Sequence, residues 1–600
     1  MSPLKRQHVA SDDGGADRKI LMAVDFGTTF SGLAWSQTRK PEIQTPIIRW
    51  PDAVSGGLEG ISSDKVPTEL KYDGQNYKWG FEIGDTGQRY KWFKLDLDSS
   101  QDRSLFSMGT KLPDTQALPP GYSVSSEKLV TDYLTALRKH AEQVLGYYFP
   151  QSALRSTPIE FIITVPAVWS DAAQLKTRVC AQLAGMGSAS EIRIISEPEA
   201  AAIYALDAMD PHELNIGDTF VLCDAGGGTV DLISYTVSAL KPILEIDEAA
   251  PGTGACCGST FLNRRFEEYM KDKFGNDNDW DEEVLEEAMK RFELVVKRTY
   301  SDVGGQEFTI PGNAQRSLTV VLLTLVLVPG LTDNPETGVR RGKIVLGAAE
   351  LRGVFRPVID EVIILIKGQV RATKKSVKAV LLVGGFGQSA YLRDSIRGAM
   401  GDSGIEVMQS PNGWTTVVRG ALMKGLMETS SAVAGVKINA RAARKHYGTE
   451  SSKQFREQLH DIARRYWNGC EGEYRINTID WFISKGALVR EEEPTRLNYT
   501  QKRVLFIGHP MNVKTDILVC SDPINIGAPV YKNLRVAHLV TLTADLSRVS
   551  ITKFPKLVGK DGLSYYNVTF QIEITHYSAY TKYELIHDGI NYGAINVEYV

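Results

Sequence analysis

Two segments of the chain combine an aspartate, a glycine-rich turn and threonine, which are residue types that bind phosphate. The first is Ile20 to Trp35, ILMAVDFGTTFSGLAW, and the second is Thr219 to Val237, TFVLCDAGGGTVDLISYTV. Each predicts a β-hairpin with a tight turn, because glycine adopts the required backbone angles freely and lets the backbone approach a ligand. The repeated design indicates two related lobes.

A nucleoside triphosphate needs backbone donors around its phosphates, carboxylates that hold magnesium through water, and an oriented attacking water. Asp25 of the first hairpin is placed to lie beside such a metal, and Asp224 and Asp231 of the second are placed near the metal and the water. Either turn alone is equally well explained as a tight turn and nothing more. The turn residues predicted to contact phosphate are Gly27, Thr28, Thr29, Gly226, Gly227, Gly228 and Thr229.

Two further segments have strand, turn and helix signals. Glu160 to Val165 predicts a strand that ends at Pro166, and Asp171 to Ala184 then has helical spacing. Ala379 to Val383 predicts a strand that runs into Gly384 and Gly385, followed by a helix from about Ser389 to Met400. Backbone N–H groups at the start of such a helix suit an anion.

The composition sets limits on the function. A chain of 600 residues is too long for one core, so two or three domains are expected. The 68 Lys and Arg against 72 Asp and Glu leave a net charge of -4, which gives no field toward nucleic acid or anionic lipid. Six scattered cysteines form no disulfide or metal-binding pattern, so we expect a reducing compartment, the cytoplasm or also the nucleus.

Several segments predict the limits of the domains. The polar residues 1–18 predict a disordered tail, and Leu318 to Val328 predicts a buried strand too short to span a membrane. The character changes near residues 430–440. Ala440 to Trp467 is basic and predicts helix, with its charges on a solvated face; a basic interaction surface is the alternative. Arg475 onward predicts antiparallel β-structure.

Five motifs occur in the order in which one family carries its phosphate, connecting and adenosine motifs: DFGTT, TVPA, ISEPEAAAIYAL, DAGGGTVD and LLVGGFG. On these, the chain resembles a divergent heat shock protein 70, within the actin-like ATPase superfamily, and its arrangement is similar to the family's member-12 branch. The resemblance implies an α/β fold: a two-lobed actin-like ATPase domain with ribonuclease H-like lobes at residues 19–435 (lobe I about 19–212, lobe II about 213–435). A helical linker and a divergent β-rich C-terminal domain would occupy residues 436–600.

The resemblance also implies roles for single residues. Asp25 and Asp224 would orient hydrated Mg²⁺, Glu197 and Asp231 would complete the polar shell, and Thr28 and Thr229 would contact phosphate. Lys94, in KWFKLDL, would reach the γ-phosphate and the attacking water; the alternative is a solvated surface lysine.

For the nucleoside, VVKRTYS is similar to the family helix that lines adenine and ribose, which implies Lys297, Arg298 and Ser301; a solvated basic face is the alternative. Gly384 and Gly385 would lie against adenosine or the α-phosphate. Phe386 and Gln388 stand where the family has a small polar residue and an arginine, and Phe386 either stacks on the base or belongs to the core.

The expected function is a slow ATPase that uses ATP/ADP and Mg²⁺ to control a chaperone-like C-terminal domain with an unknown protein client. A co-chaperone or exchange factor is a further expected partner, whereas nucleic acid and a membrane span are not expected. Two alternatives stay open: a nucleotide-dependent scaffold that does not hydrolyse ATP, and a small-molecule kinase of the same superfamily.

Overall fold

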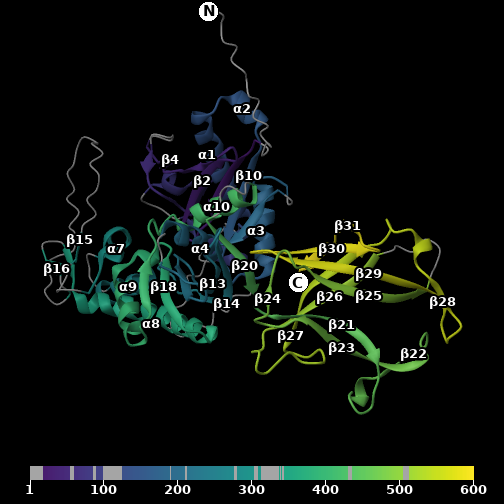
Figure 1. Ribbon diagram of the computed structural model, residues 1–600. Coiled ribbons are helices and arrows are strands. Elements are labelled where there is room, and N and C mark those ends of the chain that lie inside the picture. The colour runs from purple at the N-terminus through teal and green to yellow at the C-terminus, as the bar shows by residue number, and fades with distance from the viewer. Residues whose placement is uncertain are drawn as a thin grey trace, which may run out of the picture.

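An α/β part is followed by a part built almost wholly of strands (Figure 1). The structure is a computed structural model, and the predicted strand Leu318 to Val328 and nearly all of the predicted tail lie outside the residues that it describes. These residues are 18–54, 60–84, 89–98, 124–188, 191–209, 213–275, 280–302, 308–311, 337, 339–340, 343–429, 435–504 and 512–599.

The first sheet of the α/β part has the strand order β11-β10-β1-β2-β3, with β6 paired to β2. Strands β1 and β2 form the antiparallel hairpin predicted for Ile20 to Trp35, and β10 runs parallel to β1. Strand β1 is buried along its whole length because helices cover both faces of the sheet. The bounds are β1 (Ile20–Asp25), β2 (Phe30–Gln37), β3 (Lys40–Pro46), β6 (Val66–Pro67), β10 (Ile159–Val165) and β11 (Arg193–Ser196).

The second sheet begins with the same arrangement, β19-β18-β12-β13-β14, and then adds β20 and β24. The hairpin predicted for Thr219 to Val237 is confirmed as β12 and β13, and β18 runs parallel to β12 as β10 does to β1. The bounds are β12 (Thr219–Ala225), β13 (Val230–Ala239), β14 (Leu244–Ala255), β18 (Val377–Val383), β19 (Glu406–Gln409), β20 (Val436–Ala442) and β24 (Leu488–Val489).

Two helices lie between the sheets, α4 (Glu197–Ala208) and α10 (Thr416–Thr429), and share one apolar core with residues of both. They cross closely, since a Cβ at Gly420 would lie 1.7 Å from the carbonyl oxygen of Ala200. The predicted helices after Pro166 and Gly385 are confirmed as α3 and α9. The other helices are α1 (Ser126–Tyr148), α2 (Gln151–Ser156), α3 (Asp171–Leu183), α5 (Thr260–Phe274), α6 (Glu282–Arg291), α7 (Lys297–Thr299), α8 (Ala348–Thr373) and α9 (Ala390–Met400).

Short strands complete the α/β part. A three-stranded sheet has the order β8-β7-β9, another has the order β15-β17-β16, and β4 pairs with β5. Their bounds are β4 (Arg49–Trp50), β5 (Ile61–Ser62), β7 (Glu69–Asp73), β8 (Asn76–Trp79), β9 (Tyr90–Lys91), β15 (Phe308–Pro311), β16 (Val339–Arg340) and β17 (Lys343–Leu346).

The C-terminal part consists of two antiparallel sheets that share an apolar core, as predicted. One has the order β22-β23-β21-β26-β27-β32, and the other β25-β29-β30-β31 with β28 on β29. The bounds are β21 (His446–Gln454), β22 (Tyr466–Asn468), β23 (Glu473–Ile483), β25 (Thr495–Val504), β26 (Asn512–Cys520), β27 (Val536–Asp545), β28 (Lys556–Val558), β29 (Ser564–His576), β30 (Thr581–His587), β31 (Ile590–Ala594) and β32 (Asn596–Tyr599).

The helix predicted over Ala440 to Trp467 is wrong. The segment contains the end of β20, all of β21, a short 3₁₀ turn at Ile462–Arg464 and part of β22. Strand β20 pairs in parallel with β14, so a long-range sheet contact overrides the local pattern. Arg441 is also buried on Glu199 rather than solvated. The predicted domain boundary at 435/436 stays a prediction, and β20 continues the second sheet beyond it.

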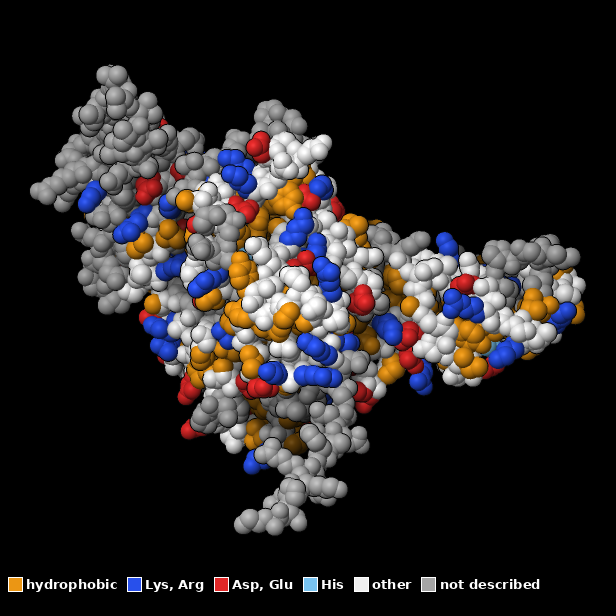
Figure 2. Space-filling view, turned by 90° about the horizontal axis from the view of Figure 1, so that it is seen from above, with side chains coloured by type: hydrophobic (Ala, Val, Ile, Leu, Met, Phe, Trp, Pro, Cys, Tyr) orange, Lys and Arg blue, Asp and Glu red, His pale blue; other side chains and the backbone are white. Residues whose placement is uncertain are grey.

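The surface is mixed in charge. On the face seen in Figure 2, basic and acidic side chains are scattered among apolar and neutral ones, and the strand-rich part extends to one side. Among the described residues, no helix is both long and apolar enough to cross a membrane.

Candidate functional site

A cavity of about 250 Å³ lies where the turns of the two hairpins meet. The structure brings nearly all of the predicted site residues to its wall. Ser301 and Asp231 are not among the lining residues, and Asp231 lies directly behind the wall, paired across the hairpin with Asp224. The lining residues are Asp25, Gly27, Thr28, Thr29, Phe30, Lys65, Lys94, Glu197, Asp224, Gly226, Gly227, Gly228, Thr229, Ser259, Glu293, Lys297, Arg298, Gly384, Gly385, Phe386, Gln388, Ser389, Trp414 and Val417.

The two glycine-rich turns touch each other. A Cβ at Gly227 would lie 2.1 Å from Oγ1 of Thr29, and a Cβ at Gly228 would lie 2.7 Å from Oγ1 of Thr28. Only glycine lets the second turn approach the first this closely. The arrangement gathers backbone N–H groups and two threonine hydroxyls at one end of the cavity, which is a suitable environment for phosphate oxygens.

A second glycine pair closes another side of the cavity. Gly384 follows β18 with a φ of +82°, and a Cβ there would lie 2.4 Å from Oδ1 of Asp224 and from the carbonyl oxygen of Ala225. Both the backbone angle and the space therefore require glycine. After Gly385, Ser389 caps α9 by accepting a hydrogen bond from the backbone N–H of Leu392.

Four carboxylates are concentrated at the phosphate end: Asp25, Glu197, Asp224 and Asp231. Burial raises the pKa of Asp224 well above its ordinary value, and the nearby Glu197, Asp231 and Asp25 raise it further. Burial also raises the pKa of Asp231, and its Oδ1 is buried without a hydrogen-bond partner. Ionisation of all four carboxyl groups is therefore unfavourable in the ligand-free site, and a bound cation would favour it.

The fit to a metal ion follows from this donor set. Within the described ranges, no three His, Cys, Asp or Glu side chains are arranged to hold a metal ion directly. Carboxylates that act through water suit Mg²⁺, which keeps several of its water ligands in protein sites. The residues present therefore fit a hydrated Mg²⁺ held by Asp25 and Asp224, which remains a prediction.

Lys94 is buried rather than solvated. Its side chain is 1% exposed, its Nζ donates to Oε1 of Glu197 at 2.6 Å, and it lies over the rings of Phe26 and Trp169. The short 3₁₀ helix Phe93–Leu97 holds it in place. The structure thus places a cation beside the buried carboxylates, and the alternative of a solvated surface lysine is wrong.

The pH dependence of stability tests the environment of Glu197. Burial raises its pKa from 4.5 to about 7; Lys94 opposes the shift, and Asp25 and Asp231 add to it. Because the folded carboxyl group binds its proton more tightly than the unfolded one, its contribution to stability is present below pH 4.5 and is lost as the pH rises through 7. The ligand-free protein is expected to lose at most about 3 kcal/mol in this window.

Unfolding of the wild type and of Glu197→Gln, followed at several pH values between 4 and 8, measures this effect. Glu197→Gln is expected to lose less stability than the wild type between pH 4.5 and 7. This comparison of pH slopes does not depend on which of the two proteins is more stable at any single pH. Equal pH slopes in the two proteins would show that Glu197 has an ordinary pKa.

The opposite end of the cavity is formed by the segment after α6. Lys297 is buried and forms an ion pair with Glu293, and its Nζ lies 3.2 Å from Oδ1 of Asn263. Residues Phe292–Val296 form a π-helical turn, and Glu293 lies four residues before Lys297, on the same face of the helix. A solvated basic face is therefore wrong for Lys297.

Aromatic and cationic side chains meet beside this segment. The guanidinium carbon of Arg298 lies 5.1 Å from the ring centre of Trp414, and the ring of Phe30 meets Trp414 edge-on at 5.5 Å. A Cβ at Gly385 would lie 3.3 Å from the same indole. This end of the cavity thus offers flat apolar and cationic surfaces, which suit a planar base.

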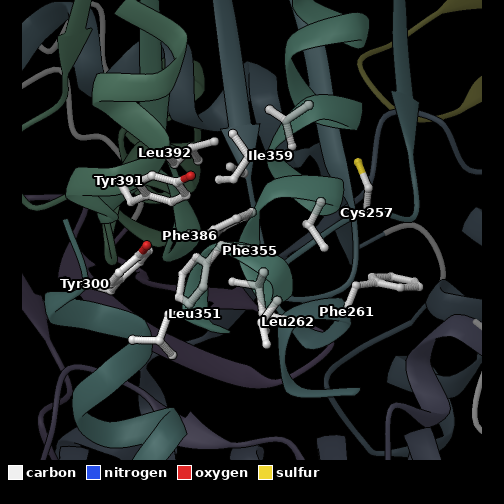
Figure 3. Close-up of a cluster of buried hydrophobic side chains, with 14 of the residues drawn as sticks. Cys257, Phe261, Leu262, Tyr300, Leu351, Phe355, Ile359, Phe386, Tyr391 and Leu392 are labelled. Carbon is white, nitrogen blue, oxygen red and sulfur yellow. The ribbon is translucent and has the colours of Figure 1, made fainter. Parts of the chain in front are cut away.

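Phe386 belongs mainly to the core. It is 4% exposed and lies in the apolar cluster of the second sheet, near Phe355, Tyr391 and Leu392 (Figure 3). Gln388 lines the cavity, and its side chain fills the space beside Gly413. Of the two alternatives for Phe386, the core assignment matches its burial.

The wall residues that the sequence analysis did not predict include Lys65, Glu293 and Trp414. The signal for Glu293 was present, because a glutamate four residues before a lysine on a helix favours an ion pair. No local sequence pattern marks Lys65 or Trp414 as a site residue, because the tertiary fold brings each of them to the cavity wall. Lys65 precedes β6 and Trp414 precedes α10.

The comparisons with known proteins agree with this geometry. The model of the family "Hsp70 protein" matches residues 108–314. The chain is 24% identical over 505 residues to the heat shock 70 kDa protein 12A of Mus musculus, covering 71% of this chain and 73% of that protein. It is 24% identical to the 12B protein of Homo sapiens, covering 68% and 69%. The chaperone protein HscA of Pectobacterium carotovorum subsp. carotovorum (strain PC1) is 25% identical and covers 49% of this chain.

The fold, the cavity between its glycine-rich turns and these matches define an Hsp70-like nucleotide-binding protein with a β-rich C-terminal region. The resemblance carried by the five motifs is confirmed. The chain resembles a divergent heat shock protein 70 and is similar to the 12A and 12B proteins of that family over about 70% of its length.

Proposed function

We propose that the chain binds Mg-ATP between two actin-like lobes, hydrolyses it slowly and thereby controls its C-terminal part as a chaperone-like interaction domain. The contact between the two glycine-rich turns above buried carboxylates carries this proposal. Equivalent turns, one from each sheet, would enclose the phosphates from both sides. A change at the γ-phosphate would then alter how closely the two lobes approach each other.

Residues at different positions along the cavity would contact different parts of the nucleotide. The phosphates would lie at the two turns, within reach of Thr28 and Thr229, and the base would lie beside Arg298 and Trp414. Bound Mg²⁺ would neutralise phosphate charge. Lys94 would orient the attacking water, and Glu197, whose pKa of about 7 lets it exchange a proton near neutrality, would accept the proton of that water.

A contact between the two parts of the chain supports the control of the C-terminal domain. The backbone N–H of Ser196 donates to Oγ of Ser578 at 3.0 Å, and Ser578 lies in the turn between β29 and β30. In the same turn, Ala579 packs into the core of the first sheet and Tyr580 stacks on the guanidinium of Arg178 at 4.3 Å. Ser196 immediately precedes Glu197, so a movement of Glu197 would act on this turn.

Single-turnover hydrolysis of ATP by the wild type and by Asp224→Asn tests the proposal, after binding is established for both by titration calorimetry. Asp224→Asn keeps the shape of the side chain and removes its charge. We expect the wild type to turn over slowly and the variant to be about a hundredfold slower, because charge that stabilises the transition state is lost. Equal rates at background level, with tight binding in both, would contradict hydrolysis.

That second outcome would select a nucleotide-dependent scaffold that binds ATP without hydrolysing it. One observation favours this alternative: the amino group of Lys94 is already bound to Glu197 at 2.6 Å, so the γ-phosphate and the water must compete for it. In the scaffold, ATP binding alone would set the relation between the lobes and the C-terminal domain.

The cellular setting is part of the same proposal. All six cysteines are free, which supports work in a reducing compartment, the cytoplasm or the nucleus. A protein client at the C-terminal domain and a co-chaperone or exchange factor at the lobes are the partners that such a cycle requires.

A further inference from the structure

Lys65 brings a second buried cation into the cavity. It lies between β5 and β6, and β6 pairs with β2 next to the first glycine-rich turn. Its Nζ lies 2.5 Å from Oδ2 of Asp25, and the two side chains are 10% and 5% exposed. Its aliphatic stem runs along Gly32, where a Cβ would lie 3.3 Å from Cγ of Lys65. The ammonium group is thus held at the phosphate end and still lines the cavity.

The ion pairs at the phosphate end of the cavity show which carboxylate Lys65 neutralises. Lys94 pairs with Glu197 and Lys65 pairs with Asp25. Among the described residues, neither Asp224 nor Asp231 forms an ion pair with a lysine or arginine. Lys65 therefore neutralises Asp25, one of the two carboxylates that are predicted to face the metal ion.

We propose that Lys65 is a fixed counter-charge of the phosphate site, which lets the chain bind nucleotide with little dependence on a divalent cation. This inference rests on the proposed binding of ATP between the lobes. A buried ammonium reduces the repulsion between phosphate oxygens and the carboxylates, which is one of the tasks of a bound divalent ion. Because it occupies one oxygen of Asp25, it also leaves fewer carboxylate oxygens for the water shell of that ion.

The dependence of nucleotide affinity on Mg²⁺ separates this role from a purely structural one. A lysine that only anchors the segment before β6 would change the stability of the ligand-free protein, and its loss would weaken binding by the same factor with and without Mg²⁺. The loss of a counter-charge has a different effect. With Mg²⁺ present, the ion replaces the missing charge and the affinity changes little; without Mg²⁺, the affinity falls.

The experiment measures the Kd for ATP by titration calorimetry, in millimolar Mg²⁺ and in EDTA, for the wild type and Lys65→Met. Removal of Mg²⁺ is expected to weaken wild-type binding by no more than about tenfold, and to weaken binding by Lys65→Met by at least about a hundredfold. Lys65→Gln keeps a hydrogen bond to Asp25 without the charge and is expected to behave as Lys65→Met does, so it carries the test if the methionine variant fails to fold.

Lys78→Met is the matched control, because Lys78 is an exposed lysine on β8 of the same lobe. It is expected to match the wild type, and Lys65→Arg, which keeps a cation, is expected to stay close to it. Equal loss of affinity in EDTA for the wild type and the uncharged variants would overturn the inference and leave ATP binding intact. A wild type that binds no nucleotide even with Mg²⁺ would overturn the proposed function and this inference together.

Discussion

Gly258→Ala is expected to reduce ATP affinity by at least about a hundredfold, although Gly258 is not among the residues that line the cavity. A Cβ at this position would lie 2.4 Å from the carbonyl oxygen of Gly227 and 2.7 Å from the carbonyl carbon of Gly228. Both are backbone atoms of the second turn, so no side-chain rotation can relieve the overlap. The backbone of the turn must therefore shift from its position in the cavity wall.

The contact at Gly258 tolerates little displacement, because the segment after β14 holds the turn through backbone hydrogen bonds. The N–H of Gly258 donates to the carbonyl oxygen of Gly228 at 3.1 Å, and the N–H groups of Ser259 and Thr260 donate to Gly226 and Gly227. The whole turn is thus held by one short stretch of chain. A displacement of Gly258 by a few tenths of an ångström shifts all three donors together.

Calorimetric titration with ATP checks this prediction, beside thermal unfolding to confirm that the variant is folded. Gly368→Ala serves as the control, because no atom lies within 4 Å of a Cβ at Gly368 and the residue is in the interior of α8. That substitution is expected to leave affinity unchanged and to stabilise the helix by about 0.5–1 kcal/mol. An affinity of Gly258→Ala within twofold of the wild type would show that the turn does not depend on this support.

Arg441→Met is expected to destabilise the protein by about 3–5 kcal/mol, because it leaves the carboxylate of Glu199 buried without its partner. Arg441 donates to Glu199 through Nη2 at 2.7 Å and through Nε at 3.1 Å, and the side chains are 9% and 3% exposed. Burial alone would raise the pKa of Glu199, but the bidentate Arg441 brings it below its ordinary value. The stabilisation is therefore present near neutrality and is lost in acid.

Thermal unfolding of four proteins measures the effect: the wild type, Arg441→Met, Glu199→Gln and the double variant. The double variant is expected to be more stable than Arg441→Met, because it removes the unpaired charge. Arg193→Met is a matched control, since Arg193 forms more exposed ion pairs with Glu160 and Glu428 and should lose only about 1 kcal/mol. Equal losses of stability for the two arginine variants would show that the buried ion pair at Arg441 contributes no more than an exposed one.

The parts of the site that the sequence predicted depend on local spacing. The two hairpins, the turn glycines and Asp25 and Asp224 each belong to one short segment, so their position relative to each other follows from a few residues. The equivalence of the two segments also indicated two related units, and the structure has two sheets that begin with the same arrangement of strands. Lys65 and Trp414 could not be found in this way, because their position depends on where distant strands and helices pair.

The failed prediction at Ala440 to Trp467 has a related cause. The local pattern predicts a solvated helical face for Arg441, Arg444 and Lys445, because exposed basic residues are common on helices. Arg441 instead neutralises the buried Glu199, and Arg444 donates to the carbonyl oxygen of Ala167, next to the predicted strand-ending Pro166. The local periodicity of a segment does not reveal a buried acceptor that is distant in the sequence. Such acceptors let this basic segment form a buried strand instead of a surface helix.

The placement of β20 has a consequence for any shortened form of the protein. Strand β20 covers the edge of β14, and β24 in turn pairs with β20 through Arg441 and Ala442. A fragment that stopped at residue 435 would leave the N–H and C=O groups on this edge of β14 unpaired, near Leu244 and Ile246, although β13 would still pair with the other edge. Such a bare strand is a template for another chain, so the fragment would be prone to aggregate. A fragment that also included β20 and β24 would keep this edge closed.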